Sequence, residues 1–118
     1  MSMVRGRAAR DANRLDEAIR WFSQATVAWP ADGDSWAALG NAYLLQNRYR
    51  EAIAAYERAL PDVIGRNSGL PSSLALAYVA MNDETNATRV LRLSGKSEAS
   101  IGAEIQDLRD LVRRRPVR

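Results

Sequence analysis

The sequence predicts an all-helical protein, built from three pairs of antiparallel helices and one further helix. One reason is composition: the 118 residues include 20 Ala and 12 Leu but only seven Val and five Ile, and β-branched side chains lose rotamer freedom in a helix. The other reason is a repeat, because Glu17-Ala18-Ile19 recurs as Glu51-Ala52-Ile53, 34 residues later. A period of this length is typical of helix pairs that stack on their neighbours.

The repeat extends to the apolar side chains of one helix face. Ala18, Phe22 and Ala25 recur at the same offset as Ala52, Tyr56 and Ala59, and a weaker copy, Ala87, Leu91 and Ser94, follows 35 residues later. One repeat alone buries too little surface to be stable, so about three are needed and the terminal ones drift from the pattern. We therefore expect a single domain over 1–118, with repeats at about 2–31, 33–66 and 68–96 and a capping helix at about 98–113.

Local signals place the helix boundaries. The expected helices are 3–12, 16–28, 35–46, 50–60, 70–81, 84–94 and 98–113. The first is placed by the register of the repeat, and the second ends before Pro30, which cannot continue a helix. Asp32 and Asp34 supply capping acceptors before the third helix. Pro61 ends the fourth helix and opens an irregular joint over 61–68.

The second half of the chain has its own signals. Asp83 supplies the cap of the sixth helix, and Gly95 suits a left-handed C-terminal cap. The seventh helix carries an apolar stripe with charges on its other face. The stripe consists of Ile101, Ile105, Leu108, Leu111 and Val112. We expect this helix to cover the face that a fourth repeat would cover; the alternative is an assembly segment that also leaves to engage a partner.

The middle repeat carries a known pattern, W-x2-L-G-x2-Y followed by A-x3-F, in the residues Trp36, Leu39, Gly40, Tyr43, Ala52, Tyr56 and Ala59. Over residues 2–95 the chain thus resembles the tetratricopeptide repeat (TPR) family. The first copy keeps Gly6, Ala18, Phe22, Ala25 and Pro30, and the third keeps Leu74, Tyr78 and Ala87. The resemblance implies a right-handed α-α superhelix, the TPR solenoid.

Small and aromatic residues alternate in this pattern for a physical reason. Paired helices approach closely only where small side chains meet, and the aromatic rings fill the space between successive pairs. We expect Gly40 and Ala52 to lie where their helices come closest.

The absent residues exclude many kinds of active site. Without Cys or His there is no thiolate nucleophile, imidazole base, haem-binding histidine or Cys/His zinc site. No glycine-rich phosphate loop or serine-plus-base arrangement stands out, and Glu104 and Asp110 are spaced as solvent-facing carboxylates. The sequence therefore predicts no enzyme, no cofactor, no metal and no small-molecule substrate.

The resemblance implies binding of a partner polypeptide in a concave groove, lined by the first helix of each pair. The candidate groove residues are Arg7, Arg10, Asn41, Leu44, Leu45, Leu76 and Val79. Further positions carried over with them are Asp11, Asp34, Ala37, Ala38, Ser72, Ser73 and Ala80. An amide at position 41 can donate to and accept from a peptide backbone, although Asn41 could equally be a solvated helix residue. The leucines and valine favour an apolar or amphipathic ligand, with Arg7 and Arg10 near its acidic end.

Other interpretations stay open. The chain could be a self-assembly module or a piece of a longer TPR scaffold. Binding of nucleic acid or anionic lipid by 113–118 is less favoured, because the net charge is only +3 and no aromatic residue interrupts the arginines. Trp21 and Trp29 either pack on the following repeat or serve as interface anchors.

No motif in the sequence identifies the partner, and the expected compartment follows from apolar runs and charges. The longest apolar run, Leu74 to Met81, is too short to span a membrane, and the arginines near the start interrupt a signal-peptide core. This favours the cytoplasm, or the periplasm if the chain is part of a longer one. Many bacterial proteins similar to this one are assembly factors.

Overall fold

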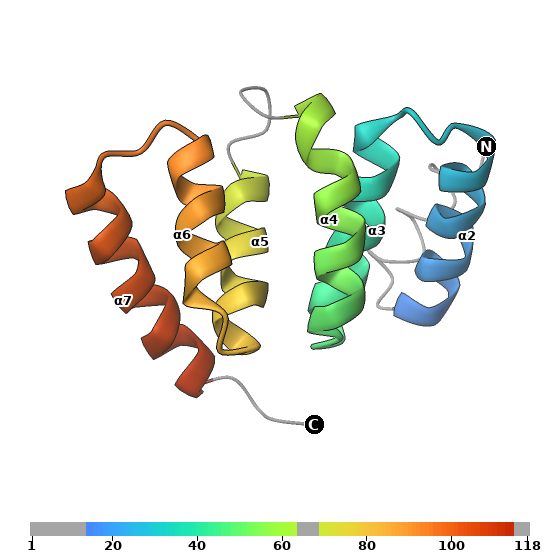
Figure 1. The fold of residues 1–118 in the computed structure, drawn as a ribbon. Helices are drawn as coiled ribbons and strands as arrows, with labels where there is room; N and C mark the ends of the chain where they lie inside the picture. The colour runs from blue at the N-terminus through green and yellow to red at the C-terminus, as the bar shows by residue number, and fades with distance from the viewer. Residues whose placement is uncertain (1–13, 64–68, 115–118) are drawn as a thin grey trace.

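Six α-helices form the part of the protein that the computed structural model describes, residues 14–63 and 69–114 (Figure 1). They are α2 (Leu15–Ala28), α3 (Gly33–Leu45), α4 (Tyr49–Val63), α5 (Gly69–Ala80), α6 (Glu84–Leu93) and α7 (Glu98–Arg114). No strand occurs in these two stretches, so the all-helical prediction is confirmed. The expected first helix, with Arg7 and Arg10, lies outside the described residues.

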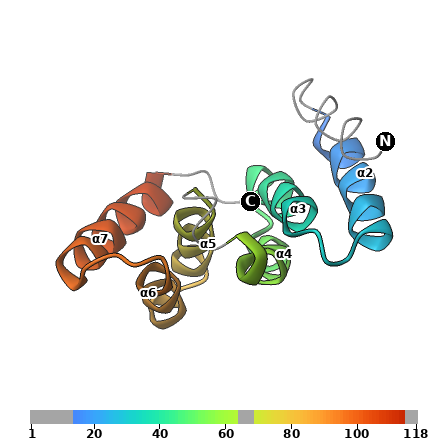
Figure 2. The same cartoon turned by 90° about the horizontal axis from the view of Figure 1, so that it is seen from above.

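The helices stack as pairs. α3 packs on α4 and α5 packs on α6, while α2 and α7 lie at the two ends of the row (Figure 1). Seen from above, α3, α5 and α7 lie on one side of the molecule, and α4 and α6 lie on the other (Figure 2). This is the arrangement expected of a TPR solenoid, in which α7 takes the place of the first helix of a further pair.

The caps predicted at Asp32 and Asp83 are present, whereas Asp34, which was also expected to cap, lies inside α3. One carboxylate oxygen of Asp32 accepts from the backbone N–H of Asp34 at 3.1 Å and the other from the hydroxyl of Ser35 at 2.8 Å. This helix begins at Gly33, two residues earlier than expected. The side chain of Asp83 likewise accepts from the backbone N–H of Asn86 at 3.2 Å at the start of α6. The caps satisfy N–H groups that have no partner within the helix.

Two asparagines make the tight turns within the pairs. Asn47 lies between α3 and α4 with a φ of 58°, and Asn82 lies between α5 and α6 with a φ of 61°. Asparagine adopts this left-handed conformation more readily than other residues with a side chain. Gly95 has a φ of 88° after α6, which confirms its expected role as a C-terminal cap.

Pro61 does not end its helix, contrary to the prediction. α4 continues to Val63, so Pro61 lies inside its last turn. The lost backbone hydrogen bond is offset by contacts that the turn makes with the rest of the protein. Val63 is fully buried in the core, and the side chain of Asp62 accepts from the backbone N–H of Gly33 at 2.9 Å.

The core has two parts. The larger joins α3 to α7 around the buried side chains of Tyr56, Leu74 and Leu91. The smaller joins α2 to α3 and α4 around Phe22 and Leu39. The rings of Trp36 and Tyr43 pack against both parts, which is the space-filling role expected of the aromatic positions.

The close approach expected at Gly40 is confirmed. A Cβ atom at this position would lie 2.7 Å from the ring of Tyr56. Because this distance is well inside van der Waals contact, only glycine fits against the ring without a shift. The other expected small residue, Ala52, is fully buried in the larger part of the core.

α7 packs along α5 and α6. Its buried side chains are Ile101, Ile105 and Leu108, with Val112 packed beside them. Leu111 was expected in the same stripe, but it is 43% exposed. The positions 101, 105, 108 and 112 follow the i, i+4, i+7, i+11 spacing of one helix face, and residue 111 falls off that face.

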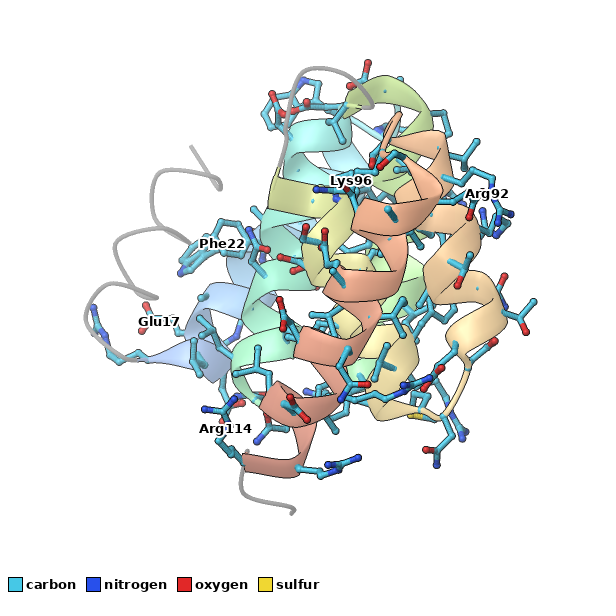
Figure 3. The ribbon with its side chains drawn as sticks, turned by 90° about the vertical axis from the view of Figure 1, so that its left-hand side faces the viewer. Glu17, Phe22, Arg92, Lys96 and Arg114 are labelled. Carbon is cyan, nitrogen blue, oxygen red and sulfur yellow. The ribbon has the colours of Figure 1, made fainter. Side chains whose placement is uncertain are left out.

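Polar contacts hold α7 in the same place. The guanidinium of Arg109 donates to both oxygens of Glu84 on α6, at 2.5 and 2.6 Å. Lys96 and Arg92 lie on opposite sides of the start of α7 (Figure 3). Lys96 pairs with Glu104 at 3.0 Å, and Arg92 pairs with Glu98 at 2.8 Å. These contacts support the expected capping position. No helix in the described residues combines the length and the apolar character needed to cross a membrane.

Candidate partner-binding face

The candidate site is the surface of α3, α5 and α7 on the side away from α4 and α6 (Figure 2), here called the groove face. Five of the predicted groove residues lie on α3 and α5: Asn41, Leu44, Leu45, Leu76 and Val79. The other two, Arg7 and Arg10, fall outside the residues that the structure describes.

Asn41 lies at a small pocket between α3 and α5. The pocket has a volume of about 170 Å³ and is lined by Ala37, Asn41, Tyr56, Gly69, Leu70 and Ser73. Three of these residues, Ala37, Asn41 and Ser73, were expected at the groove from the register of the repeat. They lie close together because α3 and α5, the first helices of two successive pairs, lie side by side.

The hydroxyl of Tyr56 fixes the amide of Asn41. It donates to the Oδ1 atom of Asn41 at 2.5 Å. Burial raises the pKa of Tyr56 to about 12, although a hydrogen bond with Ser73 opposes the shift, so the hydroxyl stays protonated near neutral pH. The carbonyl of Asn41 is thus occupied, and its Nδ2 group donates to no acceptor within the described residues. That group is a free donor at the pocket.

The two leucines at the end of α3 differ in exposure. Leu45 is 57% exposed. Leu44 is half-buried and packs against the core. Leu45 therefore supplies most of the apolar surface that α3 offers at this end.

Leu76 and Val79 are only 7% and 5% exposed, which corrects the expectation that both line an open groove. They follow Ser72 at spacings of four and seven residues, so the three share one face of α5. The hydroxyl of Ser72 donates to Glu104 of α7 at 2.6 Å, which shows that this face is turned toward α7. Leu76 and Val79 lie in the same core cluster as the apolar stripe of α7.

Two residues of α7 that were not expected on the groove face, Glu104 and Leu111, also lie there. Glu104 was expected to face solvent, but its side chain is 20% exposed and contacts both Ser72 and Lys96. Leu111 lies seven residues further on and therefore on the same side of the helix. Continuing the repeat register one unit beyond the third repeat would have suggested them.

The remaining candidates are easily placed. Trp29 is 52% exposed, so of the two alternatives for this residue, packing on the following repeat is wrong. Trp21 is half-buried, and its indole N–H donates to Glu17 at 3.4 Å. Within the described residues, no group of three or more carboxylates is arranged to hold a metal ion.

Comparisons with known proteins agree with this architecture. A family model described as a tetratricopeptide repeat matches residues 3–68. The chain is also similar to the formate-dependent nitrite reductase complex subunit NrfG of Escherichia coli O157:H7, with 39% identity over 64 residues. That match covers 52% of this chain and 32% of the relative, so the chain spans about a third of the protein it matches. The chain therefore belongs to the tetratricopeptide repeat family, whose members are typically non-enzymatic modules for protein–protein interaction.

Proposed function

We propose that this protein holds a segment of a partner polypeptide on the groove face and catalyses no reaction of its own. The observation that carries the proposal is the amide of Asn41. Its Oδ1 atom is held by Tyr56, so its Nδ2 group is left to donate at the pocket between α3 and α5. A donor fixed in this way suits a backbone carbonyl of an extended segment.

The surroundings of Asn41 favour a ligand with a predominantly apolar face. Leu45 follows Asn41 by four residues on α3, so both lie on the same side of the helix, and Leu45 is exposed in the free protein. Burial of one leucine side chain contributes about 1.5 to 3 kcal/mol. Arg7 and Arg10 remain part of the proposal as residues that favour acidic groups at one end of the ligand.

The similarity to a protein named as a subunit of a nitrite reductase complex supports a role within an assembly of several proteins. We therefore propose that this chain acts as an adaptor or assembly factor.

Substitution of Leu45 tests the proposal. Leu45→Glu should weaken binding of the co-purified partner more than tenfold, about 1.4 kcal/mol, and leave the helical content unchanged. Leu93→Glu is the matched control, because Leu93 is 56% exposed but lies on α6, outside the groove face. Isothermal titration calorimetry and circular dichroism measure the two effects.

Three outcomes would contradict the proposal. If Leu45→Glu unfolds the protein, Leu45 belongs to the core. If a folded Leu45→Glu variant binds as tightly as the unchanged protein, the partner contacts another surface. If Leu93→Glu weakens binding equally, the effect is one of added charge and not of the groove face.

Self-assembly is the second candidate function, and one observation favours it. Val27 and Trp29, at the end of α2, are both exposed although apolar, and α2 lies at one end of the row of helices (Figure 1). Light scattering over a range of concentrations tests this candidate. A monomer mass that does not change with concentration removes it.

A further inference from the structure

A second pocket lies outside the groove face, between α3 and α4, and we call it the Trp36 pocket. It has a volume of about 410 Å³. Its lining includes Trp36, Leu39 and Tyr43 of α3 and Ala54, Ala55 and Arg58 of α4. Leu39 and Ala55 belong to the part of the core shared with α2, so the pocket opens on the α2 side of this pair, away from α5.

An arginine guanidinium lies over each of the two aromatic rings of the pocket, those of Tyr43 and Trp36. The guanidinium of Arg48 lies 4.8 Å from the ring centre of Tyr43, and that of Arg58 lies 4.7 Å from the ring centre of Trp36. Arg48 is also paired with Glu51, another lining residue, at 2.9 Å. The charges of Arg48 and Glu51 thus compensate each other.

Arg58 differs from Arg48 in its charge balance. Among the residues that the structure describes, no carboxylate lies within ion-pair distance of Arg58. The nearby Glu57, on the same helix, is engaged by Arg89 at 2.5 Å and by the hydroxyl of Tyr78. Arg58 is therefore an uncompensated positive charge at the rim of an apolar pocket.

Stacking on Trp36 prepares Arg58 for a carboxylate. A guanidinium that lies over an aromatic ring keeps the N–H groups of its edge available, and these match the two oxygens of a carboxylate. The ring of Trp36 is itself held, since its indole N–H donates to the backbone oxygen of Pro30 at 2.9 Å. The ring that Arg58 stacks on is thus held in place before a ligand binds.

We propose that the Trp36 pocket binds an acidic segment of a partner protein, with an apolar side chain of that segment against Trp36 and Ala54 and a neighbouring carboxylate on Arg58. This site is separate from the groove face, so it stands or falls independently of the function proposed above. The charge of Arg58 selects the occupant: a basic segment would place cation against cation.

The indole N–H signal of Trp36 in a ¹⁵N–¹H correlation spectrum is the direct test. Substitution of Trp21 and Trp29 by Phe assigns the three indole signals. The probe is an acetylated and amidated six-residue peptide of alternating Leu and Glu, and a peptide of alternating Leu and Lys is its control. The Glu peptide should shift the Trp36 signal in a saturable way, and the Lys peptide should not.

Two variants separate a specific site from diffuse attraction. Arg58→Gln should weaken the Glu peptide about fivefold or more, equivalent to about 1 kcal/mol. Arg50→Gln removes the same charge from an exposed position of α4 that does not line the pocket, and it should change the affinity less than twofold. Ala54→Glu, at an exposed lining residue, should abolish the shift while leaving the helical content unchanged.

Other results would overturn the proposal. Equal weakening by Arg58→Gln and Arg50→Gln would mean non-specific electrostatics. A peptide that shifts the amide signals of Asn41 but leaves Trp36 unchanged would bind the groove face alone. If the protein forms a dimer that Ala54→Glu dissociates, a second copy of the chain occupies the pocket. If millimolar Glu peptide does not shift the Trp36 indole signal, the pocket does not bind the proposed ligand.

Discussion

Replacement of Gly40 by alanine tests the packing between α3 and α4. The added Cβ atom would lie 2.7 Å from the ring of Tyr56, whereas ordinary contact begins at 3.4 Å, so the ring must withdraw by about 0.7 Å. Tyr56 is fully buried and its hydroxyl is bonded to Asn41, which leaves the ring little freedom to move. Overpacking of this kind costs about 1 to 3 kcal/mol.

Two further effects enter the expected magnitude. A weakened hydrogen bond between Tyr56 and Asn41 costs about 1 kcal/mol, and the replacement of glycine by alanine in a helix gains about 0.8 to 1 kcal/mol. The net loss in the free energy of unfolding is then about 2 kcal/mol. For a chain of 118 residues the unfolding entropy is about 0.25 kcal/mol/K, so the melting temperature should fall by about 8 °C. Gly40→Leu should cost more.

Thermal unfolding followed by circular dichroism measures the effect. Gly102→Ala is the control, because a Cβ atom at that exposed position of α7 meets nothing within 4 Å. It should raise the melting temperature by a few degrees through helix propensity alone. Combining Gly40→Ala with Tyr56→Leu should remove most of the cost of Gly40→Ala. An unchanged or raised melting temperature for Gly40→Ala would refute the reasoning.

Two other predictions concern the end of the stack and the tyrosines. Truncation before Ser97 removes Ile101, Ile105 and Leu108, each of which contributes about 1.5 to 3 kcal/mol when buried. The shortened chain should therefore aggregate, as measured by light scattering, or lose most of its stability, as measured by thermal unfolding. A stable monomer would contradict the capping role. Burial raises the pKa of both Tyr56 and Tyr78 to about 12, and Glu57 adds to the shift of Tyr78. Because these values exceed 10.0, the ordinary tyrosine value, the associated stability is present below pH 10 and is lost as the pH rises toward 12. Ultraviolet titration should therefore show a late phenolate phase that shrinks in Tyr56→Phe and in Tyr78→Phe. Ionisation of Tyr56 and Tyr78 themselves near pH 10 in the folded protein would contradict this.

The sequence was sufficient to predict the six helices of the described residues and the pairs α3–α4 and α5–α6, because capping signals are local and the repeat is visible in the sequence itself. Asp32 and Asp83 cap their helices as expected, and Gly95 adopts the expected positive φ. The prediction that α4 ends at Pro61 was wrong because its last turn is held by a distant contact. Asp62 in that turn accepts from the backbone N–H of Gly33, 29 residues away. No local pattern reports a contact of that kind.

The composition of the groove face was less predictable. The repeat register assigned Asn41, Ser73, Leu76 and Val79 to one groove. Asn41 and Ser73 line the same pocket, whereas Leu76 and Val79 are buried. Whether such positions are open depends on what packs beside them, and here α7 covers that side of α5. The same packing places Glu104 on the groove face, for which no residue of α7 was expected.

Tyr56 links the stability of the fold to the chemistry of the groove face. Its ring occupies the space that Gly40 leaves open, and this contact determines where its hydroxyl lies. The hydroxyl in turn donates to the Oδ1 atom of Asn41, and no described residue accepts from the Nδ2 group of that amide. A residue required for packing thus also orients the polar group proposed to bind the partner, and changes in this packing should alter affinity as well as stability.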